Sequence, residues 1–233
     1  MGEESDGDAP AEVVREYGPF PGAPRVNGVS FDGALVWFAS GERLNGLDPV
    51  SGEIVRVLEV ADSRAGTAFD GRHLFQIAGD QIQKIDPATG QVLSTIPAPG
   101  GGHDSGLAWG EGSLWVGQYQ ERKIHQLDPE TGAVLRTIES NRFVTGITWV
   151  DGELWHGTWE GDQADLRQID PVTGEVLERL TMPEGMGVSG LESDQRELFY
   201  AGGGGSGRVR AVRKPPGRAG RSGGRPARSA LRR

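Results

Sequence analysis

The chain has 233 residues, of which 36% are hydrophobic, 38 are glycine and none is cysteine, so disulfides and thiolate chemistry are excluded. Its apolar runs fall short of the roughly 18 residues that cross a bilayer, which argues against a membrane protein. The net charge of −9 is uneven, because residues 207–233 hold ten Lys and Arg and no acid, leaving 14 basic and 33 acidic residues elsewhere. A body this acidic argues against a nucleic-acid surface on the fold itself.

Residues 1–11 are polar and acidic and lack the apolar core of a signal peptide. We therefore expect them to be disordered, and we expect a cytoplasmic, monomeric protein. The following segment, residues 12–19, alternates like a strand and resembles residues 90–97 further along the chain. It is predicted to be the outermost strand of a sheet whose other strands do not lie next to it in the sequence.

One phrase of the form Asp-Pro-x-Thr-Gly, with Ser for Thr in the first copy, recurs four times. Its aspartates are Asp48, Asp86, Asp128 and Asp170, spaced 38, 42 and 42 residues apart. Asp can cap the turn backbone, Pro presets φ, and Gly takes the positive φ. The phrase predicts a hairpin between the third and fourth strands of a repeated unit.

Two further short strands precede each phrase. The first strand begins at Gly28, Gly66, Gly106 and Gly146, and a hairpin dipeptide such as Asp32-Gly33 separates it from the second strand. Four strands in about 40 residues, repeated, are typical of propeller blades. The alternative that the repeat leaves open is an all-β solenoid.

A fifth unit is incomplete. It supplies three strands, around Leu191, Phe199 and Val209, but no fourth strand follows them. Pairing the N-terminal segment with this last sheet would close the ring and remove both exposed edges. We therefore predict an all-β fold: a five-bladed β-propeller over residues 12–215, built of four-stranded antiparallel blades, with the N-terminal strand completing the last blade.

Residues 216–233 contain Gly, Arg, Pro, Ser and Ala with a single Leu, so they cannot bury enough apolar area to fold. We expect a disordered, solvated tail. Nucleic acid is expected as a partner only through this basic segment.

Propeller ligands usually bind on the top face, where loops join one blade to the next and second strands to third. The aromatic residues of the first strands are predicted to pack between blades and not to bind; they are Phe31, Phe69, Trp109 and Trp149. A ring of small, mostly polar residues is predicted around the channel mouth: Asn27, Ser105, Thr145 and Ser189. We expect water to fill this ring, or a cation such as calcium to bind in it. No carboxylate cluster there predicts a metal site, and no other cofactor is expected.

The top loops of the predicted blades offer the aromatic walls and charges of a small-ligand pocket. The candidate ligand-binding residues are Arg64, Gln118, Tyr119, Arg142, Phe143, Trp159 and Glu160. His103 beside Asp104 is the candidate general base, since a carboxylate can orient an imidazole. Adjacent strand residues point to opposite faces, so such a pair requires an irregular loop, which Gly100-Gly101-Gly102 would permit. The alternative is a solvated histidine.

Blades 3 and 4 resemble the plant-type and bacterial glutamine cyclotransferases, or glutaminyl cyclases, which are five-bladed propellers. The similar elements include Asp104-Ser105-Gly106-Leu107, Phe143-Val144-Thr145-Gly146-Ile147-Thr148 and Leu154-Trp155-His156-Gly157-Thr158-Trp159. The resemblance covers roughly 60 residues in the same order and spacing. It implies a site at the top of the channel with Trp159 as a wall. The repeat is also similar to virginiamycin B lyase, whose seven blades would need a longer chain.

The family's two proposed catalytic glutamates fall on Val116 and Thr145. Cyclising an N-terminal glutamine requires a general acid–base that protonates the departing ammonia, and valine cannot do this. The sequence thus favours a propeller that binds a small molecule or peptide, and leaves open whether it is also a cyclotransferase-like or lyase-like enzyme. The alternative is a non-catalytic platform for a cationic peptide or protein.

Overall fold

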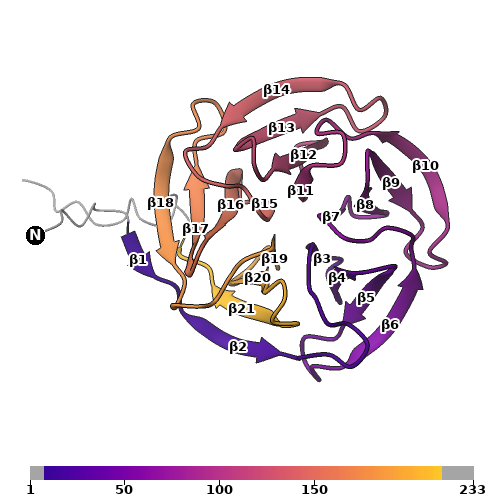
Figure 1. Cartoon of the computed structure of the whole chain (residues 1–233), viewed down its shortest axis with the longest axis horizontal. Helices are drawn as coiled ribbons and strands as arrows, with labels where there is room; N and C mark the ends of the chain where they lie inside the picture. The colour runs from indigo at the N-terminus through magenta and orange to yellow at the C-terminus, as the bar shows by residue number, and fades with distance from the viewer. Residues whose placement is uncertain (1–7, 217–233) are drawn as a thin grey trace, which may run out of the picture.

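The computed structural model describes residues 8–216, which form five β-sheets arranged around a central axis (Figure 1). Blade 1 contains β3 (Val29–Phe31), β4 (Val36–Ser40), β5 (Arg43–Leu47) and β6 (Ile54–Glu59). Blade 2 contains β7 (Thr67–Phe69), β8 (Leu74–Ala78), β9 (Gln81–Ile85) and β10 (Val92–Pro97). Blade 3 contains β11 (Asp104–Gly110), β12 (Ser113–Gln118), β13 (Lys123–Leu127) and β14 (Val134–Glu139).

Blade 4 contains β15 (Ile147–Val150), β16 (Glu153–Glu160), β17 (Gln163–Ile169) and β18 (Val176–Thr181). Blade 5 contains β19 (Gly190–Ser193), β20 (Leu198–Gly202), β21 (Val209–Arg213) and β2 (Val13–Tyr17). The predicted five-bladed, all-β propeller is confirmed. Within residues 8–216 there is no helix with the length and apolar character of a membrane span.

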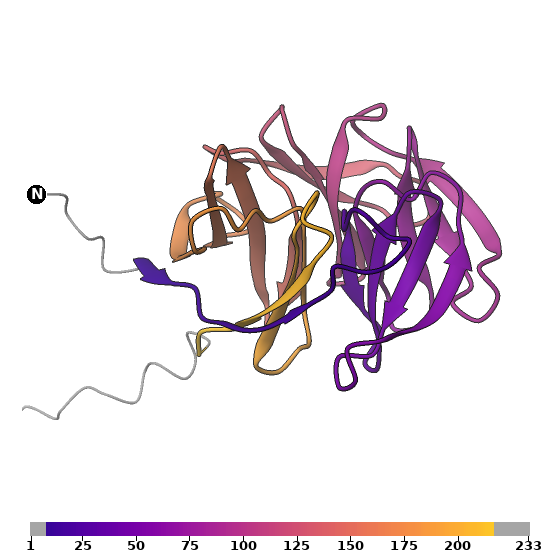
Figure 2. The ribbon, with the colours of Figure 1, turned by 60° about the horizontal axis from the view of Figure 1, so that its bottom comes forward.

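The N-terminal strand closes the ring. β2 pairs antiparallel with β21, with Val13 opposite Val212 and Tyr17 opposite Val209. Arg210 Nε also donates to Glu16 Oε2 at 2.9 Å across the same pair. Figure 2 shows β2 lying along β21 at the edge of the molecule. The last blade is therefore completed by the beginning of the chain, as predicted.

One strand at the N-terminus differs from the expectation that residues 1–11 are disordered. β1 (Asp8–Pro10) pairs in parallel with β18 and gives blade 4 a fifth strand. The outer edge of β18 offers unpaired backbone groups to the chain on its way to β2, and Arg179 Nε donates to Asp8 Oδ1 at 3.0 Å. Residues 1–7 and the predicted disordered tail, from residue 217 on, lie outside the described part.

Glycine at the start of each inner strand allows the five blades to meet at the axis. A Cβ at any of these glycines would lie 2.2–2.6 Å from a backbone atom of the next blade's inner strand; they are Gly28, Gly66, Gly106, Gly146 and Gly190. No side chain fits in that space. The glycines thus set how closely the inner strands approach.

The aromatic residues of the repeat form the joints between blades, as predicted. The ring of Trp149 stacks on Trp115 of blade 3 with centroids 5.2 Å apart, and Trp109 stacks on Phe75 of blade 2 at 5.8 Å. Phe31 meets Tyr200 at 5.8 Å across the junction of blades 5 and 1. Such pairs contribute roughly 0.5–1.5 kcal/mol each beyond their buried area.

The Asp-Pro-x-Thr-Gly turns have the predicted geometry. Asp128 Oδ1, for example, accepts the N–H groups of Glu130 at 3.0 Å and Thr131 at 2.8 Å, and Gly132 has a φ of +74°. These turns lie on the bottom face with the hairpins that join first strands to second. The loops between blades therefore lie on the opposite, top face.

Candidate functional site

The top loops of blades 3 and 4 bring together the three predicted aromatic residues. The rings of Tyr119 and Phe143 have centroids 4.6 Å apart, and the Tyr119 hydroxyl donates to Trp159 O at 3.1 Å. The Arg122 guanidinium lies 4.7 Å from the centre of the Phe143 ring, which adds a cation–π contact. We call Tyr119, Phe143 and Trp159 the aromatic cluster.

Two glycines on other loops leave room for the Trp159 ring. A Cβ on Gly187 would lie 2.2 Å from Trp159 Cε2, and a Cβ on Gly204 would lie 2.7 Å from Trp159 Cζ3. The indole N–H donates to Gly161 O at 2.9 Å. The ring is thus held in place from blades 4 and 5.

Arg142 and Glu160 form an ion pair next to the aromatic cluster. Arg142 Nε lies 2.9 Å from Glu160 Oε1, at an angle that does not make a hydrogen bond, and the same oxygen accepts Phe143 N–H at 3.0 Å. The Phe143 N–H, together with the Arg142 and Arg122 guanidinium groups, lowers the pKa of Glu160 below its ordinary value. Glu160 is therefore a carboxylate at neutral pH.

A cavity of about 780 Å³ opens beside this ion pair on blade 4. It is lined by Arg142, Glu160, Asp162, Gln163, Asp165, Arg179, Thr181, Met182 and Glu184. Its volume is within the range of small-molecule sites. The lining contains four carboxyl groups and two guanidinium groups, so its electrostatic potential favours a cation.

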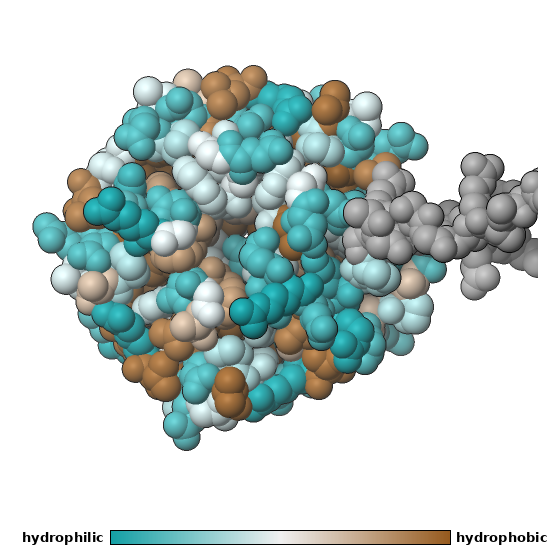
Figure 3. All heavy atoms as spheres, turned by 180° about the vertical axis from the view of Figure 1, so that it is seen from behind, coloured by the Kyte–Doolittle hydropathy of each residue, from teal (hydrophilic) through white to brown (hydrophobic). Residues whose placement is uncertain are grey.

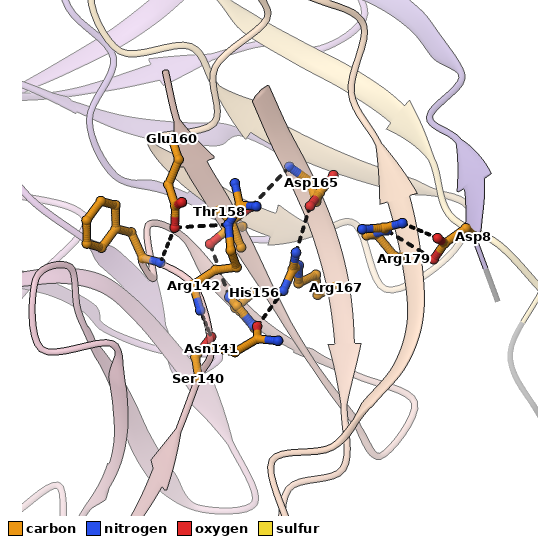
Figure 4. A network of polar contacts seen from close by, with 12 residues as sticks. Asp8, Ser140, Asn141, Arg142, His156, Thr158, Glu160, Asp165, Arg167 and Arg179 are labelled. Carbon is orange, nitrogen blue, oxygen red and sulfur yellow. Dashed lines mark hydrogen bonds and ion pairs between the residues drawn. The ribbon is translucent and has the colours of Figure 1, made fainter. Parts of the chain in front are cut away.

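A buried polar network lies between blades 3 and 4 (Figure 4), and its Asp165 lines this cavity. Arg167 donates to Asp165 Oδ2 at 2.9 Å and to Asn141 Oδ1 at 2.7 Å. Thr158 Oγ1 accepts Asp165 N–H at 3.2 Å. On the far side of Arg167 a smaller cavity of about 320 Å³ opens to the edge of blade 4. The network fixes the position of the Asp165 carboxylate.

His156 lies in the same seam and is fully buried. Its Nδ1 is 3.1 Å from Gly157 O and takes the donor role there, while Nε2 has no hydrogen-bond partner among the described residues. Burial lowers the pKa of His156 to about 4. His156 and Arg167 were not predicted as site residues; the signal in the sequence was a charged or polar residue at an inward-facing strand position.

The candidate base pair His103–Asp104 is not assembled in the described structure. Asp104 accepts Gly100 N–H at 2.9 Å and Gln118 Nε2–H at 3.5 Å, whereas the His103 side chain is exposed and has no bond to a described residue. Burial raises the pKa of Asp104 above its ordinary value. The Asp104–Gln118 pair is what the fold brings together.

The remaining predicted residues make bonds to groups outside the aromatic cluster. Arg64 pairs with Glu42 at 3.0 Å and Asp62 at 3.4 Å, and two thirds of its side chain is exposed. In the channel ring, Ser105 Oγ donates to Val144 O at 2.7 Å and Ser189 Oγ donates to Val26 O. These hydroxyls join neighbouring blades.

The channel ring offers little to a metal ion. Thr145 Oγ1 is buried without a partner, but Asn27, Ser105 and Ser189 bring no carboxylate beside it. In residues 8–216 no group of three or more His, Asp or Glu is arranged to hold a metal. The ring does not fit the oxygen-rich, charged shell that calcium takes.

Sequence comparison identifies no relative: no family model and no curated protein matches the chain. Structural comparison finds proteins of similar fold. The crystal structure of Myxococcus xanthus glutaminyl cyclase superposes with a TM-score of 0.71 at 19% identity, over 90% of this chain and 98% of that chain. This chain shares the five-bladed fold of that protein.

A less similar structure is the WD40 β-propeller domain of Doa1, with a TM-score of 0.52 at 18% identity, over 80% of this chain and 63% of that chain. The glutaminyl cyclase thus matches almost end to end, and the WD40 domain only in part. At these identities the similarity establishes the architecture, and the chemistry has to be argued from this chain's own residues.

Proposed function

We propose that this chain binds a small molecule or peptide through a cationic amine, in the cavity beside the aromatic cluster at the top of blades 3 and 4. The observation that carries the proposal is the surplus of carboxylates in that cavity. Arg142 pairs with Glu160, Arg167 pairs with Asp165, and Arg179 pairs with Asp8. This leaves Asp162 and Glu184 with no ion-pair partner among the described residues.

The aromatic cluster lies next to this cavity and does not line it. An ammonium held between Asp162 and Glu184 would lie next to the Arg142–Glu160 pair, and beyond that pair are Phe143 and Trp159. Charge fixes the position of the amine, and a ligand long enough to pass the ion pair would reach the rings. The basic residues around the cavity are already paired, so they do not compete with the ligand.

Binding without cyclisation agrees with the residues at the family's catalytic positions. Val116 is fully buried in the core between blades 2 and 3, and Thr145 is 5% exposed. Neither can protonate departing ammonia. We therefore propose a binding protein that shares the architecture, and not the reaction, of glutaminyl cyclases.

A second candidate is a cyclotransferase-like enzyme in which Asp104 transfers the proton. Burial raises the pKa of its carboxyl, which is the direction that a general acid requires, and Gln118, its partner, precedes Tyr119 of the aromatic cluster.

Calorimetric titration with a glutamine-initiated tripeptide and its N-acetylated form tests the proposal. The free amine is expected to bind at least about tenfold more tightly than the acetylated peptide. The double variant Asp162→Asn, Glu184→Gln should remove this preference, and Glu139→Gln on the outer strand of blade 3 should leave it unchanged. Equal affinity for the two peptides would contradict the proposal.

An ammonia-release assay on the same tripeptide separates the two candidates. The binding proposal predicts no release above the uncatalysed rate. Ammonia release that is lost in Asp104→Asn would support the enzymatic candidate and contradict the binding proposal. Release that persists in this variant would contradict both candidates.

A further inference from the structure

A second cavity, of about 790 Å³, lies at the opposite end of the channel. It is bounded by the ends of the inner strands and by the hairpins that join first strands to second. Figure 3 views this bottom face and shows a hollow at its centre. Nothing in the proposed function uses this cavity.

Aromatic rings form four sides of the cavity. Phe31, Phe69, Trp109 and Trp149 occupy the same position in blades 1 to 4, and all four are partly exposed and line the cavity. One part of each ring packs between blades and the remaining part faces the cavity. These residues were predicted to pack between blades only, and the surface that each turns to the cavity was not predicted.

The fifth side differs, because blade 5 breaks the repeat. Ser193 replaces the aromatic residue, and Glu192 stands where the other blades carry Ser, Ala or Thr. Glu192 is only 8% exposed, and its Oε1 accepts Thr148 Oγ1–H at 2.5 Å and Ser193 N–H at 2.8 Å. Its Oε2 has no partner among the described residues. A carboxyl buried to this extent with one oxygen unpaired leaves that oxygen available to a ligand.

Other polar atoms around the cavity are also unpaired. The indole N–H groups of Trp109 and Trp149 and the hydroxyl of Tyr200 form no hydrogen bond to a described residue. The other four tryptophans all donate through Nε1: Trp37, Trp115, Trp155 and Trp159. These groups are accessible from the cavity, so they can bond to water or to polar atoms of a ligand there.

The rim gives the cavity a negative potential. The carboxylates of Asp32, Asp70, Glu111 and Asp194 face one guanidinium, that of Arg196. Asp32 accepts Ala34 N–H and Leu35 N–H, and Asp70 accepts Arg72 N–H and His73 N–H, so both stay in place as fixed charges. A cation is attracted by this rim.

We propose that this bottom cavity binds an organic ammonium, with the Glu192 carboxylate accepting its N–H groups and the four aromatic rings enclosing its hydrocarbon body. The polar head of the ligand faces blade 5, and its body faces blades 1 to 4. This site is independent of the top cavity, since no residue lines both.

Binding should be coupled to proton release. Burial raises the pKa of Glu192 to about 8, so the free protein holds this carboxyl protonated at neutral pH. An ammonium favours the ionised form, and the affinity should therefore rise with pH up to the pKa of the amine. The other titratable or charged groups facing the cavity are Asp32, Asp70, Glu111, Asp194, Arg196 and Tyr200.

Titration with 2-phenylethylammonium, and with 2-phenylethanol as the uncharged control, tests the proposal. The amine is expected to bind about tenfold or more tightly at pH 9 than at pH 6.5, to exceed the alcohol at pH 9, and to alter tryptophan fluorescence through Trp109 and Trp149. Glu192→Gln should lose about tenfold in affinity at pH 9 and abolish the pH dependence. Equal binding of amine and alcohol, or an unchanged Glu192→Gln variant, would overturn the proposal.

Two further variants make the result specific to this cavity. Trp149→Phe keeps an aromatic wall and should retain binding with a smaller fluorescence change, which checks that the fold tolerates substitution here. The top-cavity variant Asp162→Asn, Glu184→Gln should retain the pH-dependent binding of 2-phenylethylammonium and its fluorescence change, which belong to the bottom cavity. A loss in that variant and not in Glu192→Gln would assign the amine to the top cavity and refute a site at the bottom.

Discussion

At the scale of single residues, the seam between blades 3 and 4 differs from the others in holding a buried imidazole. The position of His156 in the second strand is occupied by Phe38 in blade 1, Gln76 in blade 2, Val116 in blade 3 and Ala201 in blade 5, all of them buried and none of them titratable. A buried imidazole must remain neutral, because its charged form loses hydration that the seam does not replace. His156 therefore links stability to pH.

Acid should destabilise the protein through His156. The folded pKa is about 4 against an ordinary value of 6.5, so the unfolded chain takes up the proton first as the pH falls. Stability is fully present above pH 6.5 and is lost between pH 6.5 and about 4, by about 3 kcal/mol in total. Urea unfolding at pH 7, 5.5 and 4.5 measures this loss. His156→Gln should show a shallower slope, and an identical slope would contradict the assignment.

At the scale of elements, the sequence contained the signals for strands and turns but not for exposed edges. The Asp-Pro-x-Thr-Gly phrase specifies a turn through its own backbone preferences, so each third-to-fourth-strand hairpin could be predicted. β1 could not, because its pairing depends on the free edge of β18 and not on any pattern in Asp8–Pro10. The aromatic cluster was predictable, because its residues fall in top loops of the repeat. The cavity beside it was not, because it depends on the spacing between blades 3 and 4 at their outer ends.

The inner-strand glycines lead to a prediction about packing. A methyl group at Gly66 would lie 2.4 Å from Leu107 N, so Gly66→Ala should force two inner strands apart and destabilise the protein by about 3 kcal/mol or more. Gly205 is the matched control, because its nearest neighbour, Arg25 Nη1, is 3.8 Å from the added atom. Gly205→Ala should change the free energy of unfolding by less than about 1 kcal/mol. Similar losses in the two variants, measured by urea unfolding, would contradict close inner-strand contact.

At the scale of the whole molecule, the two proposed sites depend on one closed ring. The five aromatic and polar sides of the bottom cavity come from five different blades, and the top cavity needs blades 3 and 4 held in register. The sequence predicted the ring because four full repeats, one incomplete unit and one spare strand add up to five blades. It did not predict the bottom cavity, because repeated aromatic residues are usually buried on all sides. Here the arrangement of the five blades leaves part of each aromatic side chain open to the cavity.

A disulfide across the closing pair tests ring closure most directly. Glu16 is opposite Arg210 in the β2–β21 register, and the chain has no other cysteine to compete with a pair introduced there. In the double variant Glu16→Cys, Arg210→Cys, oxidation should give a monomer with one internal disulfide and a higher melting temperature than the reduced form. Free thiols after oxidation, or disulfide-linked dimers, would show that the N-terminal strand does not close its own ring.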